Sequence, residues 1–181
     1  MIPKVIQKNA SNLTTEELKQ IKDAIFREFK VSFNVDDQSK DRLFFLLKND
    51  KDILAMGALW KVEPIIYENK TYVVYGVLNV ISNIKGKGYG RQVVSAMRDY
   101  LIAHNFSGFG FCMLKNKGFY EKCGFITNTF STQRFVFKKN GKRITNQDGQ
   151  IIFYQESSDK LFEKIFSTQE KEISIPTTDL W

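Results

Sequence analysis

Seven residues in the middle of the chain combine glycine and positive charge in a pattern that could bind an anion. They are Lys85, Gly86, Lys87, Gly88, Tyr89, Gly90 and Arg91. Glycine allows sharp turns and lets the backbone approach a ligand closely. A helical pattern follows directly, and the first N–H groups of a helix lack intrahelical partners and carry partial positive charge. The segment therefore predicts an anion site suited to a pyrophosphate.

Two other glycine motifs fit this segment less well. A Walker A loop is excluded, because no Gly-Lys-Ser/Thr ends the run. A Rossmann fingerprint needs a different glycine spacing and a parallel βαβ unit, whereas antiparallel strands are expected before this loop. A glycine-rich connection that binds no ligand is the remaining alternative.

The elements that must position this segment are a buried strand before it and a helix after it. Val73–Ile81 is apolar and rich in β-branched residues, which favours a strand. Apolar residues recur at helical spacing over Val93–Leu101. A further strand is expected over Phe109–Met113, and then a short helix over Asn116–Cys123, closed by Gly124 as a C-terminal cap.

The N-terminal part predicts one helix followed by strands. Thr14 is a candidate N-cap, and Glu17 completes a capping box. The apolar stripe expected on this helix consists of Leu18, Ile21, Ile25 and Phe29. Strands over residues 43–47 and 53–62, and a third that begins at 71 after a turn over Glu68–Lys70, predict an antiparallel meander.

The C-terminal part predicts strands near residues 134–138 and 150–155 and a helix over 158–166. The whole pattern predicts an α+β fold with a mixed, mostly antiparallel sheet flanked by helices. A length of 181 residues favours one domain over residues 1–181. Its parts would be an N-terminal helical part over 1–40, a core over 41–126, and C-terminal strands and a helix over 127–181.

Composition limits the class of protein. Two cysteines and one histidine exclude a disulfide framework and a multi-histidine metal site, so we expect no metal. No apolar run approaches the roughly 20 residues of a membrane helix, and the start lacks a signal peptide's apolar region. We therefore expect a cytoplasmic protein. The net charge of +7 fits a polyanionic cofactor, a nucleic acid, a membrane surface or simply a basic surface.

The glycine segment resembles the cofactor loop of the GNAT superfamily of acyl-CoA-dependent N-acyltransferases. That loop reads Arg/Gln-x-x-Gly-x-Gly/Ala, and this chain has Lys85, Gly88 and Gly90 at those positions. A second segment, Phe119–Phe125, is similar to the family sequence Phe/Leu-Tyr-Glu-Lys-x-Gly-Phe. The two segments occur in the family's order, with a helix and one strand between them. The resemblance covers roughly residues 40–126.

The resemblance implies the fold, the cofactor and the reaction. The fold would be GNAT-like, with a β-loop-α-β core that binds acetyl-CoA, and the reaction would move the acetyl group directly to a primary amine of a small molecule or peptide. The loop would bind the pyrophosphate, and the backbone of Leu78, Asn79 and Val80 would hold the thioester and pantetheine. Tyr120 would be the general acid that protonates the leaving CoA thiolate.

Within the superfamily, the chain looks similar to the aminoglycoside 2′-N-acetyltransferases. The supporting features include the overall length, Asp148 before a late strand, and the C-terminal Trp181. They imply an acceptor site that includes Tyr75, Asp148 and Trp181. Where that family places acidic residues, this chain has Gly76 and Gln147. An aminoglycoside acceptor is therefore an alternative rather than the main prediction.

Several points stay open at the level of sequence. The general base could be His104, Glu63, Glu121, the carboxylate of Trp181 or a water chain. A non-catalytic acyl-CoA-binding sensor is an alternative of another class. Nucleic-acid binding is a third, but the chain offers no dedicated motif for it, and we expect neither nucleic-acid nor membrane partners. The resemblance also allows a homodimer.

Overall fold

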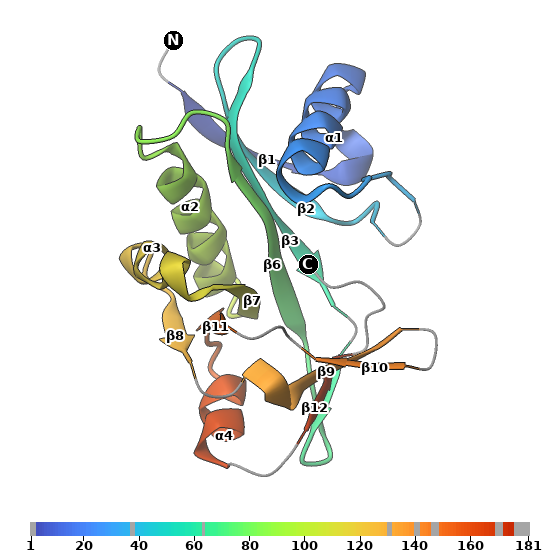
Figure 1. Ribbon diagram of the computed structural model, residues 1–181, viewed down its shortest axis with the longest axis vertical. Helices are drawn as coiled ribbons and strands as arrows, with labels where there is room; N and C mark the ends of the chain where they lie inside the picture. Colours follow the sequence, from blue (N-terminus) through green and yellow to red (C-terminus); the bar gives the residue numbers. More distant parts are fainter. Residues whose placement is uncertain are drawn as a thin grey trace. The chain divides into compact units, whose positions relative to one another are not determined.

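The computed structural model describes the chain except for residues 1, 2, 37, 38, 63, 130, 131, 140, 141, 146–148, 169–171 and 176–181, and except for the side chains of 138 and 139. The described helices are α1 (Thr15–Phe29), α2 (Tyr89–Ala103), α3 (Lys117–Lys122) and α4 (Leu161–Ser167) (Figure 1). The described strands are β1 (Lys4–Asn9), β2 (Leu43–Lys48), β3 (Ile53–Lys61), β4 (Ile65–Tyr67), β5 (Lys70–Tyr72), β6 (Val74–Ser82), β7 (Ser107–Met113), β8 (Ile126–Asn128), β9 (Phe135–Lys139), β10 (Lys142–Thr145), β11 (Gln150–Gln155) and β12 (Ile173–Ile175).

The strands form a mixed sheet in which antiparallel pairs predominate. The main sheet has the order β1-β2-β3-β6-β7-β11-β8, and smaller sheets have the orders β10-β9-β12 and β4-β5. Among the described pairs of the main sheet, only β6 and β7 run parallel. Their ladder joins Val74–Gly76 to Ser107–Phe109. The predicted α+β fold, with a strand-loop-helix-strand segment from β6 through α2 to β7, is therefore confirmed.

The chain forms two compact units. The first unit consists of residues 1–60 and 77–97, and the second unit of residues 61–76 and 98–181. Strand β6 and helix α2 each contribute residues to both units. The single domain expected over residues 1–181 stays a prediction.

In the first unit, α1 forms as the sequence predicts at its start but not at its end. Ile21 and Ile25 are fully buried. Phe29, expected on the same buried stripe, is 45% exposed. The helix ends at this residue, because Lys30 adopts a left-handed conformation with φ 60°. The last turn therefore leaves Phe29 at the surface, and the prediction for this residue is wrong.

The N-terminal strand β1 was not expected, since the sequence assigned residues 1–40 to a helical part. The strand is short and mostly half-buried, so its apolar alternation is weak. It forms because β2 offers a free edge, to which β1 pairs in antiparallel register from Lys4 to Asn9.

On β3, Gly57 lets α2 approach closely. A Cβ atom at this position would lie 2.6 Å from the sulfur of Met97.

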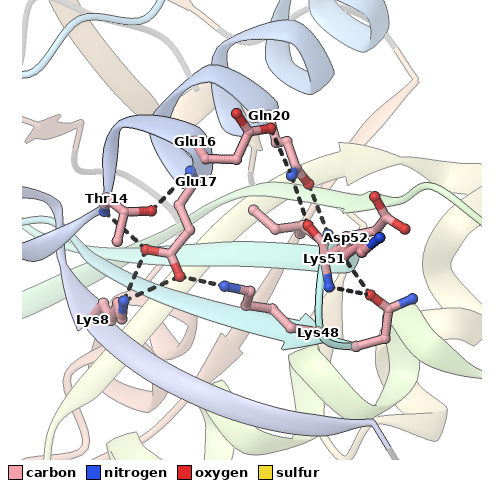
Figure 2. Close-up of polar contacts among 10 residues, drawn as sticks. Lys8, Thr14, Glu16, Glu17, Gln20, Lys48, Lys51 and Asp52 are labelled. Atoms are coloured by element: carbon pink, nitrogen blue, oxygen red, sulfur yellow. Dashed lines mark hydrogen bonds and ion pairs between the residues drawn. The ribbon is translucent and has the colours of Figure 1, made fainter.

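A buried carboxylate fastens α1 to strands β1 and β2 (Figure 2). Glu17 completes the capping box with Thr14, and its carboxylate also accepts hydrogen bonds from Lys8 at 2.9 Å and from Lys48 at 2.5 Å. Burial by itself would raise the pKa of Glu17. The hydrogen bonds from Lys48, Lys8 and the Thr14 N–H outweigh burial and lower the pKa from 4.5 to about 2.

The second unit has an aromatic core and differs from the prediction in several places. Residues Ile65–Tyr72 form a separate β4–β5 hairpin, with Glu68 and Asn69 at positive φ in its turn, rather than continuing the meander. Helix α4 begins at Leu161 instead of residue 158, because left-handed Lys160 precedes it. Strand β12 was not expected and pairs in parallel with β9. Fully buried rings in this core include Phe109, Phe135, Phe153 and Phe162.

Candidate functional site

The glycine segment forms an exposed loop with sharp turns, as its glycines allow. Gly86 and Gly88 have φ values of 76° and 73°, in the left-handed region that favours glycine. A Cβ atom built on either glycine would meet nothing within 4 Å. The two glycines are therefore needed for the turn, and the surface beside them is open to a ligand.

Helix α2 begins directly at the end of this loop. Its first bond runs from the N–H of Gln92 to the carbonyl of Gly88, at 3.1 Å. The N–H groups of Tyr89, Gly90 and Arg91 consequently have no partner within the helix. The side chains of Lys85, Lys87 and Arg91 are exposed. A phosphate group could bind here, because the free N–H groups and the positive end of the helix attract an anion. The three nearby cationic side chains add to this attraction.

Within β6, Asn79 adopts the left-handed conformation, with φ 54°. This conformation costs most L-residues roughly 1–2 kcal/mol, and asparagine is among those that tolerate it best. It explains why a polar residue interrupts an apolar strand. The neighbouring Leu78 is buried and Val80 is half-buried, so their side chains pack while their backbone groups remain the candidates for binding.

Tyr120 lies on α3 and is 8% exposed. Its ring stacks on Phe153, with the ring centroids 3.6 Å apart. Burial, with smaller contributions from the Cys112 and Cys123 thiols, raises the pKa of Tyr120 well above its usual 10. The phenol therefore keeps its proton at neutral pH. It can donate a proton or a hydrogen bond, and it is a poor base.

Both cysteines are buried next to this tyrosine in the second unit. Burial raises the pKa of Cys112 to about 12, so its thiol is neutral. Neither cysteine has the electropositive, exposed environment of a nucleophilic thiol. Both cysteines therefore pack as small apolar residues.

Residues 11–125 of the chain match the acetyltransferase (GNAT) family. The match covers more than half of the chain, including the glycine loop and α3. The chain belongs to the GNAT family of acetyltransferases. The resemblance seen in the two sequence segments is therefore confirmed at the level of the superfamily, and the protein is an acyltransferase whose family uses acetyl-CoA.

Solved structures share the GNAT fold at low sequence identity. An acyl-CoA N-acyltransferase from Pseudomonas aeruginosa matches with a TM-score of 0.60 and 16% identity, over 84% of this chain and 99% of that chain. Escherichia coli ElaA matches with a TM-score of 0.61 and 15% identity, over 85% and 99%. Escherichia coli YhbS, solved in complex with CoA, matches with a TM-score of 0.57 and 13% identity, over 96% and 89%.

At these identities the likeness shows the fold alone. No curated protein sequence matches the chain significantly. The resemblance to aminoglycoside 2′-N-acetyltransferases is not confirmed.

The acceptor-site residues expected from the sequence are only partly described. Asp148 and Trp181 lie outside the described residues. Tyr75 is half-buried and stacks on Phe106, with centroids 4.8 Å apart, and burial raises its pKa. Gly76 is buried in β6, opposite Phe109. A role for Tyr75 in acceptor binding therefore stays a prediction, and its observed contact is aromatic packing.

Two of the candidate general bases have other partners. The His104 ring donates from Nδ1 to the carbonyl of Tyr100 at 2.8 Å and lies exposed beyond the end of α2, as expected of a surface residue. Glu121 is exposed and accepts hydrogen bonds from Lys117 and Thr127, which lower its pKa. Glu63, like Trp181, lies outside the described residues. Among the described residues, Tyr120 is thus a candidate acid, and no general base is assigned.

The described residues offer neither a metal-binding cluster nor a membrane-spanning helix. In the described part of the chain, no group of three or more His, Cys, Asp or Glu side chains could hold a metal ion. The described helices are all too short or too polar to cross a membrane.

One residue of the GNAT loop region escaped the sequence reasoning. Asn83, between the end of β6 and the glycines, makes three hydrogen bonds within the first unit. A polar residue after a buried strand is a common pattern and does not by itself indicate that the residue holds a loop in place. The side-chain partners of Asn83 lie 30 and 56 positions away in the chain, so no local pattern could identify them.

Proposed function

We propose that this GNAT protein transfers the acetyl group of acetyl-CoA directly to a primary amine. The observation that carries the proposal is the loop over residues 85–91, where left-handed glycines lead into the free N–H groups of α2. These groups would bind the pyrophosphate of the cofactor. Lys85, Lys87 and Arg91 would add attraction for its phosphates.

The strand before the loop would hold the thioester end of the cofactor. The parallel ladder from β6 to β7 is described only up to Gly76. Leu78, Asn79 and Val80 follow, and the left-handed turn at Asn79 changes the direction of the backbone groups around it. An N–H group aimed at the thioester oxygen would stabilise the oxyanion that forms during transfer.

Tyr120 would act as the general acid. The acceptor nitrogen forms a bond to the thioester carbon, and collapse of the tetrahedral intermediate breaks the carbon–sulfur bond. The leaving thiolate takes the phenolic proton, and the proton released by the amine returns the tyrosine to its neutral form through solvent or a base. The phenol is protonated before each transfer, as a general acid must be, but this holds already at the ordinary tyrosine pKa of about 10. Burial raises the pKa further and makes the proton harder to release, so the assignment rests on the position of Tyr120 in the family segment and not on its pKa.

Two alternatives predict different behaviour. An aminoglycoside acceptor calls for acidic side chains in the acceptor pocket, and Gly76 and Gln147 stand where they are expected. The comparisons do not favour it either. A cofactor sensor would bind acetyl-CoA without turning it over. The acceptor itself, whether a small amine, an antibiotic, a polyamine or a peptide N-terminus, is to be found by screening.

The first experiment measures ligand binding and acetyl transfer together. Acetyl-CoA at about a hundred times its dissociation constant should stabilise the protein by roughly 2.7 kcal/mol, which corresponds to about 5–10 °C in Tm. A panel of primary amines is then screened for release of the CoA thiol. Stabilisation with no release for any amine would favour the sensor. No stabilisation by acetyl-CoA, CoA or ADP would overturn the proposal.

A variant tests the role of the tyrosine. Tyr120→Phe should lower kcat by roughly 10²- to 10⁴-fold and leave the Kd for CoA unchanged, because the ring and its stacking on Phe153 are kept. Tyr154→Phe is the matched control, since Tyr154 is also a buried tyrosine of the second unit. Equal kcat values for the two variants would remove Tyr120 from the mechanism.

A further inference from the structure

The loop that would bind the cofactor has few contacts of its own, so its position depends on its two ends. Residues 85–88 are exposed. At the C-terminal end, the loop continues into α2. At the N-terminal end, the Ser82 hydroxyl donates to the carbonyl of Ile84 at 2.7 Å, and Asn83 is fixed to the rest of the first unit.

Asn83 is attached to strand β3 through two neighbouring carbonyl groups. Its backbone N–H donates to the carbonyl of Leu54 at 2.9 Å, and its side-chain Nδ2 donates to the carbonyl of Ile53 at 2.6 Å. The remaining side-chain atom, Oδ1, accepts a hydrogen bond from the guanidinium of Arg27 on α1. Both polar ends of one amide are thus used, and they connect to different elements.

Helix α1 is attached to the same end of β3 through a second residue, Gln20. Gln20 accepts a hydrogen bond from the N–H of Ile53 at 2.9 Å and donates to the carbonyl of Lys51 at 2.9 Å (Figure 2). Gln20 and Arg27 are about two helical turns apart and therefore lie on the same face of α1. The contacts form a closed circuit that runs from Gln20 to Ile53, on to Asn83, and back to α1 at Arg27.

We propose that Asn83, held by Arg27, is the positioning residue of the phosphate-binding loop, and that anion binding at the loop is coupled to helix α1 through this contact. The inference rests on the proposed function. Every link of the circuit lies within the first unit, together with the loop itself. Ligand binding at the loop and order in the last turns of α1 must then stabilise each other, because a coupling free energy is reciprocal.

The test uses calorimetric titration of the full-length protein with CoA. Arg27→Gln should raise the Kd by about three- to tenfold, and Asn83→Ala by about tenfold, as expected for one or two net hydrogen bonds. Lys19→Gln removes the same charge from an exposed position on the same helix and should change the Kd by less than about twofold. Equal effects of Arg27→Gln and Lys19→Gln would overturn the inference.

The double variant separates positioning from direct contact with the phosphates. Because Arg27 acts through Asn83, Arg27→Gln should weaken CoA binding no further in the Asn83→Ala background. Additive losses would mean that Arg27 meets the ligand independently, and would overturn the proposed coupling. Urea unfolding of each variant checks that it is fully folded during the titration, because an unfolded fraction would raise the apparent dissociation constant.

Hydrogen exchange provides a readout that a purely structural contact would not move. CoA should slow amide exchange at the loop and also in the last turns of α1 in the original protein, and only at the loop in Arg27→Gln. Slowing confined to the loop in both proteins would refute the coupling while leaving the proposed function intact. Failure of the original protein to bind CoA would refute the proposed function itself.

Discussion

Asn79 holds a backbone conformation that most side chains avoid, inside a strand whose neighbours are apolar. Its φ of 54° is in the left-handed region, where asparagine and glycine are tolerated and β-branched residues are strongly disfavoured. The backbone conformation thus explains why β6, the strand beside the proposed cofactor site, has asparagine at position 79. Asparagine can be required here even if its side chain contacts no ligand.

This explanation predicts opposite results for two substitutions at Asn79. Asn79→Val should lower the free energy of unfolding by about 1–2 kcal/mol, because valine in the left-handed region is strained. Asn79→Gly should be nearly neutral in urea unfolding and should keep CoA binding. If Asn79→Gly lost CoA binding, the side-chain amide rather than the backbone turn would be the important feature.

Helix α3 is the element that carries Tyr120, and a glycine in a left-handed backbone conformation follows its C-terminal end. Gly124 closes the helix with φ 87°. A Cβ atom there would also lie 2.9 Å from the Nε and Cζ atoms of Arg98. The positive φ favours glycine, and a side chain at this position would in addition require the guanidinium of Arg98 to shift. Gly118, near the start of α3, has nothing within 4 Å of a built Cβ and no positive φ.

The two glycines of α3 therefore provide a matched pair. Gly124→Ala should destabilise the protein by more than about 1 kcal/mol, because strain and crowding add. Gly118→Ala should be neutral or stabilising by up to about 1 kcal/mol, because alanine favours a helix. Urea unfolding of both variants measures the difference. Equal free energies of unfolding for the two variants would show that the Arg98 side chain and the end of α3 adjust to the added methyl group without cost.

At the scale of the whole molecule, charge links stability to pH. The chain carries a net charge of +7, and two of its lysines, Lys8 and Lys48, converge on buried Glu17. The pKa of Glu17 is lowered to about 2, whereas 4.5 is expected when unfolded. A lowered carboxyl pKa contributes stability that is complete above the unfolded value and is lost as the pH falls toward the folded value.

Glu17→Gln should accordingly lower the free energy of unfolding strongly at pH 7 and much less near pH 2. The lost stability at neutral pH is on the order of 2–3 kcal/mol, from a pKa difference of more than two units. Glutamine can keep the capping bond to the Thr14 N–H, so the change isolates the charge. Glu16→Gln, at a neighbouring exposed site, is the control. A penalty independent of pH would contradict the role of the ion pairs.

What the sequence determined by itself is local. The capping box at Thr14 and Glu17, the sharp turns of the glycine segment, and the cap at Gly124 each depend on residues a few positions apart, so short patterns predicted them. The two segments that mark the GNAT family are equally local. The family, the cofactor and the class of reaction therefore followed from the sequence.

Only the tertiary structure decided the features that depend on partners far away in the chain. Strand β1 exists because β2 offers it an edge, Phe29 is exposed because α1 ends there, and β4–β5 closes on itself as a separate hairpin. Asn83 has its role because Ile53 and Arg27 converge on it from other elements. Hydrogen bonds between distant residues leave no periodic trace in the sequence, and so the anchor of the loop became visible only in the fold.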